Sequence, residues 1–276
     1  MSDPDTARGP HASDTAWARA ARAVHEHATD HRGVELRELG GGLDHRTFVL
    51  GDLVVRVAGR ATATREADLL HLVAPRVSIP VPAPHFDDPQ RGVLGYSLFP
   101  GRPLLGRTPP RGAAAHLGRV LRELHRIDLA EVADLVPVDH AAPEAWLEEL
   151  TGPPELLRIL HTDRPGPTHE LVLAHADLGA EHILEQRGRL TGIIDWADAA
   201  VTDPALDFAR LHRDFGPAFL DDALLAYGQD SRELRRRITF FARCAALEDL
   251  AYGRESGREE YVRAAERSLS WLFPPS

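Results

Sequence analysis

The chain has 276 residues, of which 43% are hydrophobic, and this is long enough and apolar enough for two modest domains with real cores. It carries 42 acidic residues against 32 basic ones, a formal net charge of −10, and all the basic residues are arginine. This acidic balance argues against a nucleic-acid-binding protein, because contact with a phosphate backbone requires a basic face.

The first part of the chain reads as a helix followed by strands. Alanines and other apolar residues at helical spacing predict an amphipathic helix over residues 13–28. The period then changes to two and predicts strands at 34–39, 48–50 and 53–57. A helix from about residue 64 follows.

A proline-rich link covers residues 79–84, and the fixed proline dihedrals keep it extended, so we expect it along the edge of the sheet. Residues 93–99 predict a further strand. The rest of the chain is predicted to be mainly helical, with helices over 112–126, 143–150, 154–161, 204–212, 217–227, 232–252 and 259–272.

Residues 171–209 interrupt these helices with a short apolar strand at 171–174 and a hairpin with arms at 183–185 and 190–194. Polar side chains stand at the strand ends: Asp177 in the loop, His182 before the first arm and Asp195 after the second. A hairpin with so short a turn brings its open ends together, so His182 and Asp195 should face one another across a gap that a cation could fill. Asp177 should project toward the same gap.

The order of His175, Asp177, His182, Asp195 and Asp207 in this segment resembles the catalytic segment of the aminoglycoside and macrolide phosphotransferases, antibiotic kinases related to the protein kinases. The resemblance implies an α+β, bilobal protein-kinase-like fold, with a small β-sheet N-lobe and a larger, mainly helical C-lobe. It implies that Asp177 receives the proton of a substrate hydroxyl, and that His182 and Asp195 hold Mg²⁺ on the phosphates of ATP or GTP. His175 and Asp207 are expected to be structural, with the Asp207 carboxylate accepting N–H bonds from the catalytic loop.

The resemblance also implies a nucleotide site in the first part of the chain. Gly41 and Gly42 would lay their backbone over the phosphates, although the G-x-G-x-x-G spacing is absent. Arg56 stands where the kinase-like pattern has its phosphate-contacting lysine, and Glu66 would be the paired acid. The alternative is that this ion pair only joins the helix to the sheet.

In the resembled family, the strand at 93–99 leads into the hinge between the lobes. Backbone groups near Ser97 to Phe99 would bond the purine edge there. We therefore expect a nucleotide-binding lobe at 1–98 and a catalytic and substrate-binding lobe at 99–276.

The activity that the resemblance implies is transfer of a γ-phosphoryl group to a hydroxyl of a small-molecule antibiotic, giving resistance. An aminoglycoside or a cationic peptide antibiotic is favoured over a macrolide, because residues 99–276 carry 29 acidic residues against 21 arginines. Asp198, three residues after Asp195, is the expected contact to that cation. Two alternatives stay open: a kinase for an amino alcohol or sugar, and a catalytically silent nucleotide-binding module, suggested by Arg56, His182 and the Trp-Ala that follows Asp195.

The sequence predicts no nucleic-acid or membrane partner. No apolar run approaches the roughly 20 residues of a membrane span, and the N-terminus is too polar for a secretory signal, so we expect a cytoplasmic protein. A monomer is favoured. The single cysteine, Cys244, lies in an apolar helical run and is expected in the core.

Overall fold

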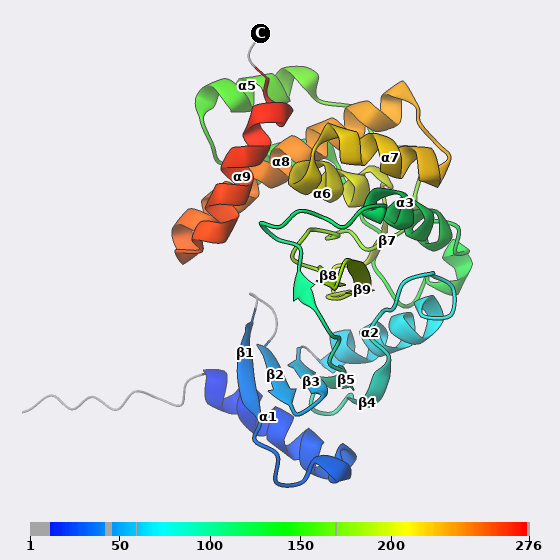
Figure 1. Ribbon diagram of the computed structural model, residues 1–276, viewed down its shortest axis with the longest axis vertical. Helices are drawn as coiled ribbons and strands as arrows, with labels where there is room; N and C mark the ends of the chain where they lie inside the picture. The colour runs from blue at the N-terminus through cyan, green and yellow to red at the C-terminus, as the bar shows by residue number, and fades with distance from the viewer. Residues whose placement is uncertain (1–11, 42–45, 59, 169, 275–276) are drawn as a thin grey trace, which may run out of the picture. The chain divides into compact units, whose positions relative to one another are not determined.

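The computed structural model describes residues 12–41, 46–58, 60–168 and 170–274 (Figure 1). The chain divides into two compact units. The first lies within Met1–His71 and Pro82–Leu98, and the second within Leu72–Val81 and Phe99–Ser276. Residues 72–81 thus pack with the second unit, although they precede the boundary expected after residue 98.

The first unit is built on a five-stranded antiparallel sheet in the order β1-β2-β3-β5-β4. All five side chains of the central strand, β3, are buried. Two helices accompany the sheet, α1 before it and α2 after β3. The elements are α1 (Ala12–His27), β1 (Arg37–Gly41), β2 (Arg46–Leu50), β3 (Leu53–Val57), α2 (Arg60–Val73), β4 (Pro84–Asp88) and β5 (Val93–Ser97).

Helix α1 packs on the sheet through its alanines. Ala16, Ala20 and Ala23 recur every three or four residues and therefore share one helical face. They belong to one buried core with Phe48 and Val55. The amphipathic helix expected from the sequence is thus present, and its apolar face covers the sheet.

Two strands of this sheet differ from the sequence-based prediction. β1 lies at Arg37–Gly41 rather than 34–39, and its backbone pairs with β2 as far as Gly41. Glycines have no side chain to show a period, so the pattern missed them. β4 was not predicted, because Pro84 at its start was assigned to the proline-rich link at 79–84. Proline cannot donate a backbone hydrogen bond, but β4 lies at the edge of the sheet, where a proline is tolerated.

The second unit is mainly helical, as the sequence predicts. Its longest helix packs against two others, so that α6 and α9 both lie along α8, while α3 packs against α7 (Figure 1). Cys244 is buried in α8, as expected. The helices are α3 (Ala113–Leu124), α4 (Pro143–Glu149), α5 (Pro154–Asp163), α6 (Ala205–Phe215), α7 (Pro217–Tyr227), α8 (Arg232–Ser256) and α9 (Glu259–Leu272).

Helices α3 and α7 approach each other closely at Gly118. A side chain at this position would overlap the backbone carbonyl of Ala223. Glycine at 118 therefore sets the spacing of the two helices. The same pair of helices brings together His125, which ends α3, and Tyr227, the last residue of α7.

Short strands in the second unit carry the segment that resembles a catalytic site. β7 (Val172–Ala174) pairs with β10 (Ala200–Thr202), and the hairpin of β8 (Ile183–Gln186) and β9 (Arg189–Ile193) pairs with β6 (Arg102–Pro103). The strand and the hairpin were predicted, whereas β6 and β10 were not, because two or three residues are too few to show a period. Among the described residues, none of the helices combines the length and the apolar composition that a membrane span needs.

Candidate active site

The strand ends of the second unit bring Asp177, His182 and Asp195 together. The N–H of Ile194 donates to the carbonyl of His182 at 3.0 Å, and this bond closes the open end of the hairpin. Nδ1 of His182 lies 3.5 Å from Oδ2 of Asp177, and Nε2 lies 3.6 Å from Oδ2 of Asp195. The imidazole thus stands between two carboxylates, in the arrangement expected from the hairpin.

The pKa values of Asp177 and His182 are shifted in opposite directions, and each residue stabilises the charged form of the other. Burial raises the pKa of Asp177, but the positive charges of Arg210 and His182 outweigh burial, and the pKa lies below its usual value. Burial lowers the pKa of His182, but the carboxylates of Asp177, Glu181 and Asp195 outweigh it, and the pKa is raised. Asp177 is therefore an ionised carboxylate that can accept a proton.

The backbone of the segment has a positive φ at three non-glycine residues: Ala176 at 65°, Asp195 at 63° and Arg187, in the hairpin turn, at 52°. The Asp207 carboxylate holds the first of them. It accepts the N–H of Ala176 at 2.8 Å and that of His175 at 3.2 Å. Its Oδ2 also lies 3.0 Å from Nε2 of the buried His125. Asp207 thus has the structural role that the sequence indicates.

His175 joins the loop to the hairpin. Its Nδ1 accepts the N–H of Asp177 at 3.3 Å, and its Nε2 donates to the carbonyl of Ile194 at 3.1 Å. Burial is the main cause that lowers the pKa of His175, so the ring is neutral and can accept at one nitrogen while it donates at the other. His175 is therefore a packed, hydrogen-bonded residue rather than a proton shuttle.

Two arginines of α6 reach into the site. Nε of Arg210 lies 3.2 Å from Oδ1 of Asp177, and its Nη1 lies 3.9 Å from Oε2 of Glu248. Arg213, one turn later, is 1% exposed and is paired with Asp214 and Asp249 among others. Nothing in the spacing of the chain indicated these contacts.

The residues fit a divalent cation. Nδ1 of His182 donates to the backbone carbonyl of Asp177 at 2.8 Å, which leaves Nε2 facing Asp195. A histidine that ligates a metal commonly donates its other N–H to a carbonyl in this way. Asp177, Glu181 and His182 form a second group of possible ligands, whose ligand atoms lie within 4.8 Å of one another.

The structure describes most of the residues of the first unit that were expected to bind the nucleotide. Arg56 and Glu66 form a buried ion pair at 2.5 Å, with side chains 3% and 4% exposed. Gly41 ends β1, and Gly42 lies outside the described residues. Oγ of Ser97 is hydrogen-bonded to His85 at 2.6 Å.

Two further expected residues lie in the second unit. Phe99 packs over Gly192 of β9, where a side chain would overlap its ring. Asp198 is exposed in the turn that follows Asp195. Neither position identifies a ligand.

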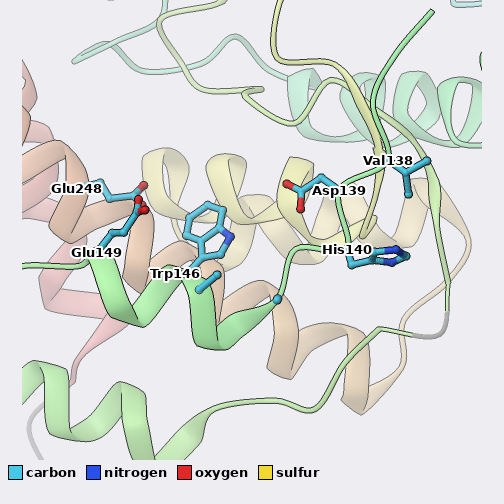
Figure 2. Close-up of a pocket in the computed structure, with 8 residues that line it drawn as sticks. Val138, Asp139, His140, Trp146, Glu149 and Glu248 are labelled. Atoms are coloured by element: carbon cyan, nitrogen blue, oxygen red, sulfur yellow. The ribbon is translucent and has the colours of Figure 1, made fainter. Parts of the chain in front are cut away.

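The second unit also has an open groove of about 690 Å³. Its lining residues are Val138, Asp139, His140, Ala142, Ala145, Trp146, Glu149 and Glu248. Figure 2 shows the indole of Trp146 between the carboxylates of Glu149 and Glu248 on one side and that of Asp139 on the other. Among the described residues that line the groove, His140 is the basic one, and its ring points away from Trp146. The groove thus offers an aromatic face surrounded by negative charge.

The sequence did not single out Trp146 and Glu149, although their spacing of three residues placed both on one face of a predicted helix. Glu248 was counted only among the 29 acidic residues of residues 99–276. The meeting of these residues depends on the packing of α4 near α8, which no local pattern specifies.

Comparison with known proteins identifies the family of the chain. Residues 35–241 match the model of the phosphotransferase enzyme family. The chain is 30% identical over 199 residues to a viomycin phosphotransferase of Streptomyces vinaceus, which covers 63% of this chain and 67% of that protein.

Solved structures are similar over nearly the whole chain. The GDP and kanamycin complex of APH(2")-IIia is 21% identical, with a TM-score of 0.71, and the match covers 92% of this chain and 97% of that one. Apo macrolide 2'-phosphotransferase MphH from Brachybacterium faecium is 27% identical, with a TM-score of 0.64, and the match covers 95% and 99%. The predicted fold class, with a small antiparallel-sheet lobe and a larger helical lobe, is confirmed. By the match of its sequence to the family model, this chain belongs to the phosphotransferase enzyme family.

Proposed function

We propose that this chain transfers the γ-phosphoryl group of ATP or GTP to a hydroxyl of a cationic antibiotic. The observation that carries the proposal is the position of His182, whose two ring nitrogens face the carboxylates of Asp177 and Asp195. A proton acceptor and a cation site then stand side by side, which is what phosphoryl transfer requires of a protein. The viomycin phosphotransferase and the kanamycin complex among the similar proteins support the class of acceptor.

In this reaction the acceptor oxygen forms a bond to the γ-phosphorus as the bond from that phosphorus to the β-γ bridging oxygen breaks. The nucleoside diphosphate leaves with the bonding electron pair, and the hydroxyl proton passes to the carboxylate of Asp177. Arg210 and His182 flank that carboxylate on its two oxygens. They hold it ionised and oriented toward the hydroxyl.

Asp195 and Nε2 of His182 would hold Mg²⁺. When bound, the ion neutralises charge on the phosphates. Asp195 offers the oxygen that magnesium prefers, and the imidazole of His182 can ligate the ion or hydrogen-bond its water shell. In the first unit, Arg56 with Glu66 and the backbone at Gly41 would contact the nucleotide.

The groove beside Glu248 suits a cationic acceptor. An ammonium or guanidinium group can lie over the indole of Trp146 and bond to Glu149 or Glu248 at the same time. Glu248 is also a partner of Arg210, which contacts Asp177, so the groove adjoins the candidate base. Val138 is 58% exposed at the opposite end and adds apolar surface.

The test is a phosphate-transfer assay with Mg²⁺ and γ-labelled ATP or GTP. Viomycin, kanamycin, a macrolide and an amino alcohol are supplied separately as acceptors. We expect label on viomycin or kanamycin, with one nucleoside diphosphate released for each labelled molecule. Label on the macrolide alone would change the acceptor class, and label on the amino alcohol alone would favour a metabolite kinase. No labelled acceptor with either nucleotide would favour the silent nucleotide-binding module.

A further inference from the structure

Arg210 is shared between the candidate base and the groove. Its Nε lies 3.2 Å from Oδ1 of Asp177, and its Nη1 lies 3.9 Å from Oε2 of Glu248. The planar guanidinium fork lets one side chain face both carboxylates. A single, partly buried cation therefore contacts the group that would take the proton and the group that would bind the acceptor.

The neighbouring Arg213 of α6 is more deeply buried and more closely paired than Arg210. It is 1% exposed, and its nitrogens lie 2.7 Å from Asp214 and 3.0 Å from Asp249. Arg210 is 16% exposed, and its longer contact reaches Glu248, which is 42% exposed. Another cation can therefore replace Arg210 at Glu248. Arg210 then stays paired with Asp177, so that no buried charge is left without a partner.

The contact of Arg210 also orients Asp177. Oδ1 faces Arg210, while Oδ2 faces Nδ1 of His182 at 3.5 Å. The carboxylate is thus held at both oxygens. If Arg210 shifts toward Glu248, the carboxylate loses one of its two supports.

We propose that Arg210 is a positioning residue that couples occupancy of the groove to the orientation of Asp177. A cationic acceptor bound at Glu248 competes with Arg210 for that carboxylate, so Arg210 bonds to Asp177 alone. When the acceptor is bound, Asp177 is thus held in its productive orientation. When the acceptor is absent, Arg210 is shared with Glu248, and hydrolysis of the nucleotide by water stays slow. This inference rests on the proposed function, because it assumes that the acceptor lies in the groove.

The first experiment separates kcat from KM. Arg210→Gln should lower kcat for the best acceptor by about 10²-fold, the usual effect of a misplaced reacting group, with the KM for nucleotide changed less than about twofold. Arg210→Lys should restore part of kcat, since it keeps the charge without the fork. The matched control is Arg243→Gln, which removes an arginine of similar burial that pairs with Asp163; its kcat should equal that of the wild type. A wild-type kcat in Arg210→Gln would overturn the inference while the proposed function stands.

The second experiment tests the coupling. Glu248→Gln should raise the acceptor KM, leave kcat near the wild-type value and raise nucleotide hydrolysis in the absence of acceptor, because Arg210 then bonds to Asp177 alone. In the Arg210→Gln background, this rise in hydrolysis should disappear, because the shared cation is gone. A hydrolysis rate that Glu248→Gln leaves unchanged in the wild-type background would overturn the coupling.

The third experiment does not depend on activity. The Arg210 Nε–H signal, identified by its loss in Arg210→Gln, is followed by NMR in the whole 276-residue chain. We expect it to shift in Asp177→Asn, and to shift when viomycin is added to the wild type but not to Glu248→Gln. A signal that moves in neither case would overturn the inference even if no acceptor is phosphorylated.

Discussion

Asp207 and Ala176 are joined by a hydrogen bond of 2.8 Å from the backbone N–H of Ala176 to a carboxylate that is fully buried. Ala176 has a positive φ, which an alanine adopts only at a cost of roughly 1–3 kcal/mol when its surroundings hold it there. The bond therefore stabilises the turn that presents Asp177. It also ties the loop that carries Asp177 to the start of α6, the helix that carries Arg210.

Removal of this carboxylate should destabilise the protein. Asp207→Ala leaves the buried N–H groups of His175 and Ala176 without their acceptor, and we expect the free energy of unfolding to fall by about 3 kcal/mol. Chemical denaturation measures it. The matched control is Asp221→Ala, which breaks an exposed pair with Arg235 and should cost less than about 1 kcal/mol. Equal losses in the two variants would show that Asp207 has no special role.

Asp177→Asn should lower kcat by at least about 10²-fold, the usual scale for loss of a general base. The amide keeps the size of the side chain, so nucleotide should bind with unchanged affinity. Steady-state kinetics and calorimetric nucleotide titration measure the two quantities. Near-normal turnover in this variant would remove Asp177 from its assigned role.

The cation site predicts unequal effects at its two residues. Asp195→Ala should abolish turnover, because the oxygen ligand is lost. His182→Asn should keep more turnover than Asp195→Ala, since an amide oxygen can replace the imidazole at the ion and Asp177 loses only its contact to Nδ1. Binding of Mn²⁺, followed by electron paramagnetic resonance in each variant, gives a reading that does not depend on turnover. Mn²⁺ bound equally well by Asp195→Ala would place the ion elsewhere.

The acceptor should bind through attraction between its positive charges and the carboxylates of Asp198 and Glu149. Asp198→Asn and Glu149→Gln should each raise the acceptor KM, and raising the salt concentration should weaken binding to the wild type, because exposed charges are screened within about 8 Å at physiological ionic strength. KM values at low and high salt measure both effects. Glu148→Gln, a neighbouring exposed acid of α4 that does not line the groove, is the matched control. A KM that depends on neither salt nor Asp198 nor Glu149 would favour an apolar acceptor.

His212 should make the fold sensitive to acid. Burial lowers the pKa of His212 to about 4, whereas the unfolded chain has the ordinary value near 6.5. The folded state therefore resists protonation, so stability is present above pH 6.5 and is lost as pH falls toward 4, by up to about 3 kcal/mol. Unfolding of His212→Gln, measured across this range, should show a smaller loss than the wild type. The exposed His161→Gln is the control, and an unchanged acid dependence in His212→Gln would exclude this histidine as the cause.

The sequence predicted the parts of the site that local pattern controls. Asp177, His182 and Asp195 stand at the ends of short strands, and a tight hairpin leaves little freedom in how those ends meet. Most helices of the second unit were also predicted, because their apolar faces repeat over several turns. The Arg56 and Glu66 pair was expected from the resemblance to the antibiotic kinases rather than from local pattern, and the structure shows it as a buried ion pair.

Contacts between distant segments were not predictable. Arg210 meets Asp177 and Glu248 only because α6 packs on α8, and the groove exists only because residues 138–149 pass near Glu248. Side-chain patterns along one segment carry no information about such meetings. Strands as short as β6 and β10 are likewise defined by their partners rather than by their own residues.

Gly118 connects helix packing to the strained loop. It lets α3 lie against Ala223 of α7, and the ends of these helices carry His125 and Tyr227, whose side chains are hydrogen-bonded at 3.0 Å. His125 in turn supports the carboxylate of Asp207. A larger residue at 118 would separate the two helices and loosen this chain of bonds from its far end. Position 118 is therefore a place where a substitution would alter the geometry of the Asp177 loop without any change to a residue of the candidate site.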